Sequence, residues 1–335
     1  MTARMSFAVP LAVALMATAC ATGGGPLRPA APADASSPAV LWRDPGGIGS
    51  RDLFWGAGNS ENAPRGPFTF VEEDLSGHNP KVSVREAGGR VWDVKFGDEV
   101  HAEVAANRLV WSLGYFVEQQ YYVPSGTIRG AKSLGRAAPH IGADGRFREA
   151  RFRFRDPAMP RTEEEWTLTH NPFVGTKELS GLYVLMTLLN NWDIEGPRNN
   201  RVLRADGPRG RSERRFLVSD LGATFGRMGG GRLMSDHSKW NLDHFRNEKF
   251  IETVDSAWLR LAHDGYDPDV ERVPIAHARW FAGLAGQLRA AQVRRAFEAA
   301  GATPSEIDGY SRKVMEKIAT LRKAVGSRAV ATTDR

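Results

Sequence analysis

The chain has 335 residues, 41% hydrophobic and 25% charged, which is typical of a foldable globular protein and excludes a disordered or fibrous chain. At about 100–200 residues per domain, this length allows one large domain or two lobes that share a cleft. The 45 Lys and Arg residues exceed the 39 Asp and Glu by six, and the arginines are scattered, so we expect no nucleic-acid partner. The single cysteine, Cys20, excludes an intramolecular disulfide and a cysteine-based zinc site.

The first twenty residues have the pattern of an export signal. Arg4 precedes an uncharged apolar run from Met5 to Ala19, which is too short for an ordinary membrane span. Small residues stand directly before Cys20, as in a bacterial lipobox, where cleavage leaves an N-terminal cysteine that carries diacylglycerol. We therefore expect a signal peptide over 1–19 and lipidation of Cys20. The alternative is a plain signal peptide with an incidental cysteine.

This interpretation makes the protein an exported lipoprotein of the bacterial cell envelope, anchored at the outer membrane by its lipid alone. Residues 20–50 are rich in Gly, Ala, Pro and Ser, so we expect them to form a lipidated, flexible tether. The folded part is predicted to begin near residue 51.

Strand patterns begin at residue 68. Alternating apolar residues in FTFVEED, KVSVRE and RVWDVKF, with Gly88-Gly89 between the last two, predict three consecutive antiparallel strands. A helix is expected to follow over residues 99–117, ending at Gly114. Residues 121–170 have an irregular pattern of strands and loops.

The second half of the chain is predicted to be mainly helical. Residues 176–192 indicate a buried helix, and the basic segment 204–215 indicates a solvated hairpin tip or a surface for an acidic substrate or anionic headgroups. From about residue 243 to 327 we expect mostly helix. A β-rich part with one helix, followed by a mainly helical part, predicts an α+β, two-lobed protein-kinase-like fold.

Two sets of polar residues fit such a fold. Lys95 lies on the third predicted strand and Glu103 on the next helix, an arrangement by which kinase-like folds fix a phosphate-binding ammonium. By itself such a pair is more often a surface salt bridge, and the predicted strand and helix around it favour the kinase-like arrangement.

Acidic and amide residues follow the buried helix. Asp193 precedes Asn199 and Asn200, which would supply a catalytic carboxylate and an oxygen ligand for Mg²⁺; an Asp/Asn-rich turn is the alternative. Asp220 ends an apolar strand and precedes Leu221-Gly222, as a second metal-binding carboxylate would, or as a simple Asp-x-Gly turn would.

The chain resembles the HipA-like kinases of the phosphatidylinositol-kinase-like atypical kinase superfamily over roughly residues 68–226. The resemblance is carried by the turn residues Gly77, Pro80 and Lys81, by the helix residues Glu103, Arg108, Leu109 and Gly114, and by the loop residues Asn191, Asp193 and Asn199 or Asn200.

This resemblance implies an ATP-binding N-lobe over 51–124 and a catalytic C-lobe over 125–330, with ATP and Mg²⁺ (or Mn²⁺) as cofactors. It implies Asp193, Lys95 and Glu103 for catalysis and Asn199 or Asn200 with Asp220 for the metal. For nucleotide binding we expect Gly77, His78, Asn79, Lys81 and Lys95, with a solvated turn histidine as the alternative for His78. The chain departs from the family in a longer spacing from Asp193 to the asparagines and in a turn with a single glycine.

The expected function is therefore ATP- and Mg²⁺-dependent phosphoryl or nucleotidyl transfer to an unidentified protein, lipid or small molecule. Export separates the chain from cytosolic ATP. The alternative is therefore a catalytically inactive kinase-like lipoprotein that uses the same cleft as a ligand- or partner-binding module.

Overall fold

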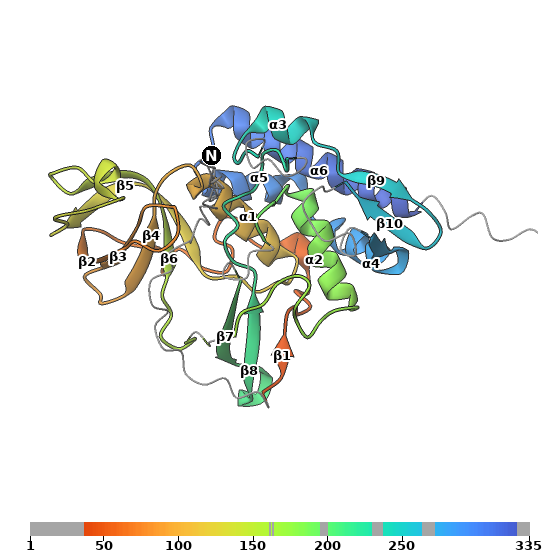
Figure 1. The fold of residues 1–335 in the computed structure, drawn as a ribbon, viewed down its shortest axis with the longest axis horizontal. Coiled ribbons are helices and arrows are strands. Elements are labelled where there is room, and N and C mark those ends of the chain that lie inside the picture. Colours follow the sequence, from red (N-terminus) through yellow and green to blue (C-terminus); the bar gives the residue numbers. More distant parts are fainter. Residues whose placement is uncertain are drawn as a thin grey trace, which may run out of the picture.

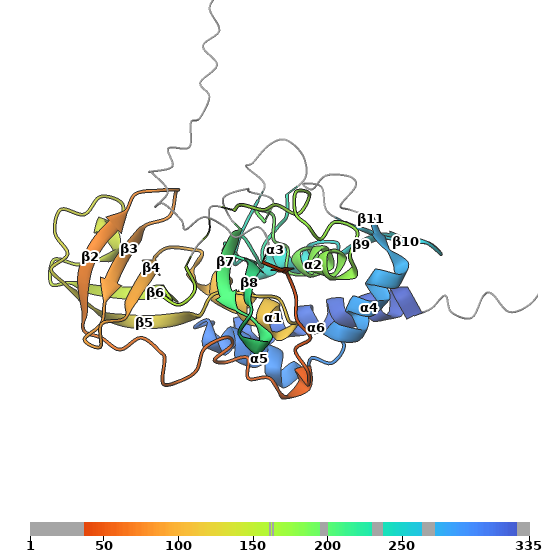
Figure 2. The ribbon, with the colours of Figure 1, turned by 90° about the horizontal axis from the view of Figure 1, so that it is seen from below.

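The computed structural model describes residues 37–160, 162, 164–194, 200–229, 237–262 and 272–326. The protein is α+β, with sheets prominent in its N-terminal part and helices in its C-terminal part. Figures 1 and 2 both place a β-barrel at one end of the long axis and the helices toward the other end. Within the described ranges, no helix is long and apolar enough to cross a membrane. The predicted signal peptide, Cys20 and Asn199 lie outside these ranges.

Five strands form the closed barrel, in the order β2-β3-β4-β6-β5. They are β2 (Phe68–Asp74), β3 (Lys81–Arg85), β4 (Val91–Lys95), β5 (Gln120–Arg129) and β6 (Arg146–Phe154). The antiparallel pairing of β2, β3 and β4 confirms the three predicted strands. Inward-facing Val84, Trp92, Val94 and Phe152 form the barrel core. The boundary expected between residues 124 and 125 falls inside β5, because the barrel continues to Phe154.

The regular strand β6 was hidden in the sequence by a local irregularity. Glu149 has φ 50°, and the pairing between β5 and β6 skips Glu149 together with Pro124, with the same register on both sides. The alternation shifts at this point, so that Phe147 and Phe152 both face the core although they are an odd number of positions apart. The expected irregular segment therefore includes a barrel strand with one local distortion.

Helix α1 (Val100–Ser112) follows β4 and is buried along most of its length. It ends near Gly114, as predicted, where φ is 93° and a Cβ would lie 2.4 Å from the carbonyl oxygen of Arg43. Helix α2 (Lys177–Leu188) confirms the predicted buried helix, and its N-cap Thr176 accepts a hydrogen bond from the Leu179 N–H.

The segment expected to complete the tether is partly folded. Strand β1 (Ala39–Val40) pairs with β8, and Leu41 and Ile48 are buried, so residues 37–50 belong to the body of the protein. These two apolar side chains outweigh the Gly- and Pro-rich composition around them. A short 3₁₀ helix, η1, covers Ile48–Ser50.

The basic segment 204–215 does form a hairpin. Its strands are β7 (Arg201–Asp206) and β8 (Ser212–Leu217), with the 3₁₀ helix η3 (Pro208–Gly210) at the tip. Another 3₁₀ helix, η2 (Ala138–His140), lies between β5 and β6.

The C-terminal region contains a small sheet that the helical prediction for 243–327 missed. Antiparallel β9 (Ile251–Val254), β10 (Trp258–Leu261) and β11 (Arg272–Pro274) follow α3 (Leu242–Asn247). These strands are too short for the sequence to show an alternation of apolar and polar residues, except at Leu259 and Leu261 on β10. The remaining helices are α4 (Ile275–Ala285), α5 (Ala290–Ala299) and α6 (Pro304–Gly326).

Candidate functional site

Lys95, at the end of β4, lies among three carboxylates. Its Nζ is 2.8 Å from Glu103 Oε2, 3.0 Å from Glu99 Oε2 and 3.2 Å from Asp220 Oδ1. The lysine is only 5% exposed. These residues come from β4, α1 and the segment after β8, so the cluster joins the barrel to the C-terminal part. The structure thus brings together three of the residues singled out in the sequence: Lys95, Glu103 and Asp220.

The cluster favours the charged forms of Lys95 and Glu103. Burial disfavours the ammonium, but Glu103, Asp220 and Glu99 outweigh that effect and raise the pKa of Lys95 above its ordinary value. Burial likewise disfavours the Glu103 carboxylate, yet nearby Arg151 and Lys95 lower the pKa of Glu103. Arg151 Nε lies 3.3 Å from Glu103 Oε1. A buried ion pair needs such supporting contacts to offset the cost of desolvation.

Glu99 is a site residue that the sequence analysis missed. It stands at the N-cap of α1, and its carboxylate accepts hydrogen bonds from Asn79 Nδ2 (2.8 Å) and Lys239 Nζ (2.8 Å). Burial favours its neutral form, but Lys95 and Lys239 reverse this and lower the pKa of Glu99. One sequence signal could have identified Glu99. It lies four residues before Glu103, a spacing that places both side chains on the same face at the start of a helix.

Gly222, two residues beyond Asp220, allows the close approach of Glu99. A Cβ at position 222 would lie 2.5 Å from Glu99 Oε2 and 2.8 Å from Glu99 Cβ. Any side chain at this position would therefore have to displace Glu99 from the cluster. The glycine of the Asp-x-Gly segment serves packing here, which a simple solvent-exposed turn would not require.

Asp220 is the most accessible carboxylate of the three, with a 36% exposed side chain, whereas those of Glu99 and Glu103 are buried. Its backbone has φ 50°, in the left-handed region that few non-glycine residues occupy. Such outliers persist where the surrounding structure fixes them, and they are frequent at functional sites. An exposed carboxylate beside a buried cluster is the arrangement expected of a group that meets a ligand.

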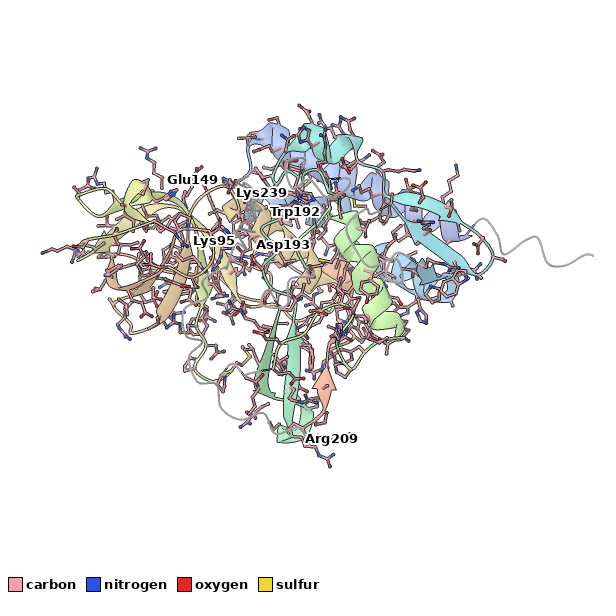
Figure 3. All side chains as sticks on the ribbon, in the orientation of Figure 1. Lys95, Glu149, Trp192, Asp193, Arg209 and Lys239 are labelled. Carbon is pink, nitrogen blue, oxygen red and sulfur yellow. The ribbon has the colours of Figure 1, made fainter. Side chains whose placement is uncertain are left out.

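The loop that carries Asp193 runs beside the segment that follows Asp220. The Trp192 N–H donates to the Ala223 carbonyl (3.3 Å), and the Asn190 side-chain amide donates to the Gly226 carbonyl (2.6 Å). Asp193 is half-buried, and its N–H donates to Asn191 Oδ1 in a local turn. In Figure 3, Asp193 lies in the central part of the molecule, on the helical side of Lys95.

Asn200 is buried between the same two segments. Its Nδ2 donates to the Ile194 carbonyl at 2.9 Å. Its Oδ1 accepts a hydrogen bond, at 3.5 Å, from the N–H of Ser219, the residue before Asp220. A carbonyl oxygen has a second lone pair, so this contact leaves Oδ1 able to accept another partner. Asn199, the other predicted ligand, lies outside the described residues.

The predicted nucleotide-binding turn lies at the edge of the cluster. Asn79 bonds to Glu99, and Lys81, which is paired with Lys95 in the β3–β4 register, lies 3.3 Å from Asp74. Gly77 has φ 67° and its carbonyl accepts a hydrogen bond from Arg136. His78 is exposed at the tip of the turn. Among the side-chain hydrogen bonds of the described residues, only that of Asn79 joins this turn to the Lys95 cluster.

A buried lysine forms hydrogen bonds to the residues just before the Asp193 loop. Lys317 on α6 donates to the Leu188 carbonyl (3.0 Å) and to Asn190 Oδ1 (2.6 Å), and its ammonium lies 4.4 Å from the centre of the Phe245 ring. Burial lowers the pKa of Lys317 to about 7. Lys317 thus ties α6 to the start of the loop.

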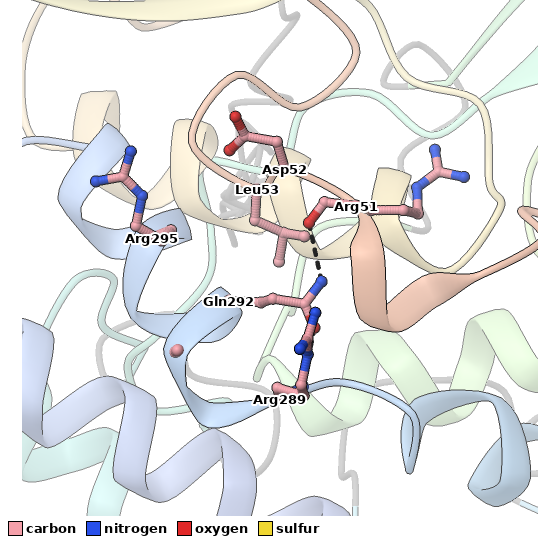
Figure 4. Close-up of a pocket in the computed structure, with 7 residues that line it drawn as sticks. Arg51, Asp52, Leu53, Arg289, Gln292 and Arg295 are labelled. Atoms are coloured by element: carbon pink, nitrogen blue, oxygen red, sulfur yellow. Dashed lines mark hydrogen bonds between the residues drawn. The ribbon is translucent and has the colours of Figure 1, made fainter.

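A separate hollow of about 260 Å³ lies between α5 and residues 51–53. Three arginines line it, but the Arg51 guanidinium is 3.7 Å from the centre of the Trp111 ring and that of Arg295 is 4.4 Å from the centre of the Phe54 ring. Figure 4 shows the Arg51 guanidinium directed away from the other lining residues. The hollow contains no member of the Lys95 cluster.

Comparisons of the chain with models of known families, with curated proteins and with solved structures found no match. The geometry of the residues themselves therefore carries the functional argument.

Proposed function

We propose that the protein is an ATP- and Mg²⁺-dependent phosphoryl or nucleotidyl transferase of the HipA-like atypical kinase type, held at the cell envelope by a lipid on Cys20. In this proposal the barrel and α1 form the N-lobe of a two-lobed kinase-like arrangement, and the later elements form the C-lobe. The observation that carries it is the 2.8 Å pair between Lys95 on β4 and Glu103 on α1, with Asp220 in contact with the same lysine.

The residues of the cluster, together with Asp193, suit distinct tasks in such a reaction. ATP with Mg²⁺ would supply the transferable group. Lys95 would present a permanently charged ammonium to phosphate oxygens, with Glu103 fixing its position. Asp193 would orient the acceptor hydroxyl and accept its proton at the carboxylate.

The oxygen donors present fit a Mg²⁺ ion. Mg²⁺ prefers carboxylate and amide oxygens as ligands. Asn200 Oδ1 accepts a hydrogen bond from the N–H of Ser219, the residue directly before Asp220, so the segments that carry the two ligands adjoin. Asp220 is also accessible, as a ligand to an entering ion must be. An ion that bound Asp220 would compete with Lys95 for this carboxylate.

One observation favours the alternative of a binding module without catalysis. Three carboxylates of the protein already surround the Lys95 ammonium, so the cluster is electrostatically satisfied without a nucleotide. In that case Lys95 would serve to join the barrel to the C-terminal part.

The test measures ATP turnover by the full chain with Mg²⁺, with water and then with protein, lipid and small-molecule acceptors. We expect Asp193→Asn to lower kcat by about 100-fold or more while ATP binding persists. Asp206→Asn, which changes an exposed aspartate of the β7–β8 hairpin, is the matched control and should keep full activity. Metal-dependent ATP binding without turnover would support the binding module, and equal activity in Asp193→Asn would refute the catalytic role.

A further inference from the structure

The β7–β8 hairpin carries a concentration of positive charge. Residues 204–215 contain five arginines against two acidic residues. The inner charges are paired: Glu213 contacts Arg43 and Arg215, and Arg214 forms two hydrogen bonds to Glu164. The stem of the hairpin is therefore held by ion pairs within the protein.

The two arginines at the tip differ from those of the stem. Arg209 and Arg211 are exposed, and no ion pair among the described residues includes either of them. Figure 3 shows Arg209 projecting from the edge of the molecule. Arg209 also has φ 64°, a left-handed conformation that glycine would adopt without strain. The protein thus keeps a cation at a position where folding alone favours glycine.

The N-terminal segment enters the body of the protein beside this tip. Strand β1 runs parallel to β8, with Ala39 opposite Arg214, so residues 37 and 38 lie toward the tip. The Ser37 carbonyl accepts a hydrogen bond from Arg214 Nε. In Figure 1 the start of β1 lies next to the end of the hairpin, at the lower edge.

We propose that the β7–β8 hairpin tip, through Arg209 and Arg211, docks on an anionic membrane surface and binds the phosphates of its lipid headgroups. The proposal rests on the lipid anchor at Cys20 and is independent of the transferase activity. Sixteen residues separate Cys20 from Ser37, a length that spans at most about 60 Å. The anchor therefore keeps the tip at high local concentration near the headgroups.

The partner follows from the charge and from the position of the tip. A guanidinium group can bind two oxygens of one phosphate at once. Each basic residue near an anionic surface also adds to the electrostatic attraction between protein and membrane, which salt weakens. Two such arginines strengthen association about 25-fold. Docking at the tip would also fix the orientation of the barrel and of the Lys95 cluster relative to the membrane.

The experiment measures backbone amide exchange over residues 206–212 in the full chain, reconstituted into vesicles of phosphatidylcholine alone or mixed with phosphatidylglycerol. The variant is Arg209→Gly with Arg211→Ser, which removes both charges and imposes no strain at position 209. The matched control is Arg146→Ser with Arg148→Ser, which removes two exposed arginines, also two residues apart, from the barrel strand β6.

We expect slower exchange at the tip, by several-fold, only in vesicles with phosphatidylglycerol, and loss of this protection in high salt. The tip variant should lose the protection and the β6 variant should keep it. Equal protection in both kinds of vesicle, protection that survives in the tip variant, or the same protection from inorganic phosphate without vesicles would overturn the proposal. A chain that fails to associate with either vesicle would overturn the lipid anchor together with it. Nucleotide binding is unaffected by all of these outcomes.

Discussion

Replacing Lys95 with methionine tests the electrostatic account of the cluster. The change removes the ammonium and leaves the buried carboxylates of Glu99 and Glu103, which have oxygen atoms within 4.8 Å of each other, without their shared cation. Two charges at that separation repel by about 3 kcal/mol at an effective dielectric constant of 20. Removing one partner of a buried ion pair typically costs about 3–5 kcal/mol. We expect Lys95→Met to lower the free energy of unfolding by that amount at pH 7.

The effect depends on pH in a defined direction. Burial raises the pKa of Glu103, but Arg151 and Lys95 more than reverse this, so its folded-state pKa lies below the unfolded value of 4.5. The stability from this lowered pKa is present above pH 4.5 and is lost as the pH falls through the folded-state pKa. The difference in the free energy of unfolding between the wild type and Lys95→Met should therefore become smaller below pH 4.5.

The assay is urea unfolding of the full chain and of the variants in a double-mutant cycle. Lys95→Met combined with Glu103→Gln should cost clearly less than the sum of the two single changes, because each single change leaves the other charge buried. Lys81→Met is the matched control, since Lys81 faces a largely exposed Asp74 and should matter by less than about 1 kcal/mol. Additive losses, or equal losses for Lys95→Met and Lys81→Met, would refute the reasoning.

Three further substitutions test packing and burial. Gly222→Ala should lower the free energy of unfolding by about 1–3 kcal/mol, because the new Cβ would lie 2.5 Å from Glu99 Oε2. Gly283→Ala on α4, where no atom lies within 4 Å of the new Cβ, should raise the free energy of unfolding by about 0.5–1 kcal/mol. Equal changes in Tm for the two variants would contradict this. Burial lowers the pKa of Lys317 to about 7 from 10.5, so the unfolded state binds more protons between these values and stability should rise with pH from 7 to about 10. Lys317→Met should flatten that rise in urea unfolding, and parallel curves for both proteins would count against it.

The sequence predicted the elements whose patterns are local. The strands β3 and β4 alternate cleanly, β2 does so only up to Phe70, where its register with β3 shifts, and Gly88-Gly89 marks the turn before β4. The pair Lys95 and Glu103 could be predicted because both residues belong to this regular region. The strand β6 could not, since the left-handed backbone of Glu149 shifts its alternation.

The remaining part of the site depends on contacts between distant segments. Glu99 owes its role to Asn79 and Lys239, which lie 20 and 140 residues away in the sequence. Lys317 reaches Asn190 across 127 residues. Neither has a local motif, because a charged residue at a helix start or in a long amphipathic helix is common on any surface. Packing alone assigns Lys317 to the site, and the spacing of Glu99 from Glu103 gains its meaning from the packing.

The most direct test of the proposed function is a thermal shift of the full chain with ATP, with and without Mg²⁺. Binding at a hundredfold excess over Kd stabilises the folded state by about 2.7 kcal/mol, which corresponds to several degrees in Tm. We predict a Mg²⁺-dependent increase in Tm that Asp220→Asn abolishes and that Asp206→Asn preserves. An unchanged Tm with ATP and either Mg²⁺ or Mn²⁺, or an equal increase in Asp220→Asn, would contradict a nucleotide site at Lys95 and Asp220.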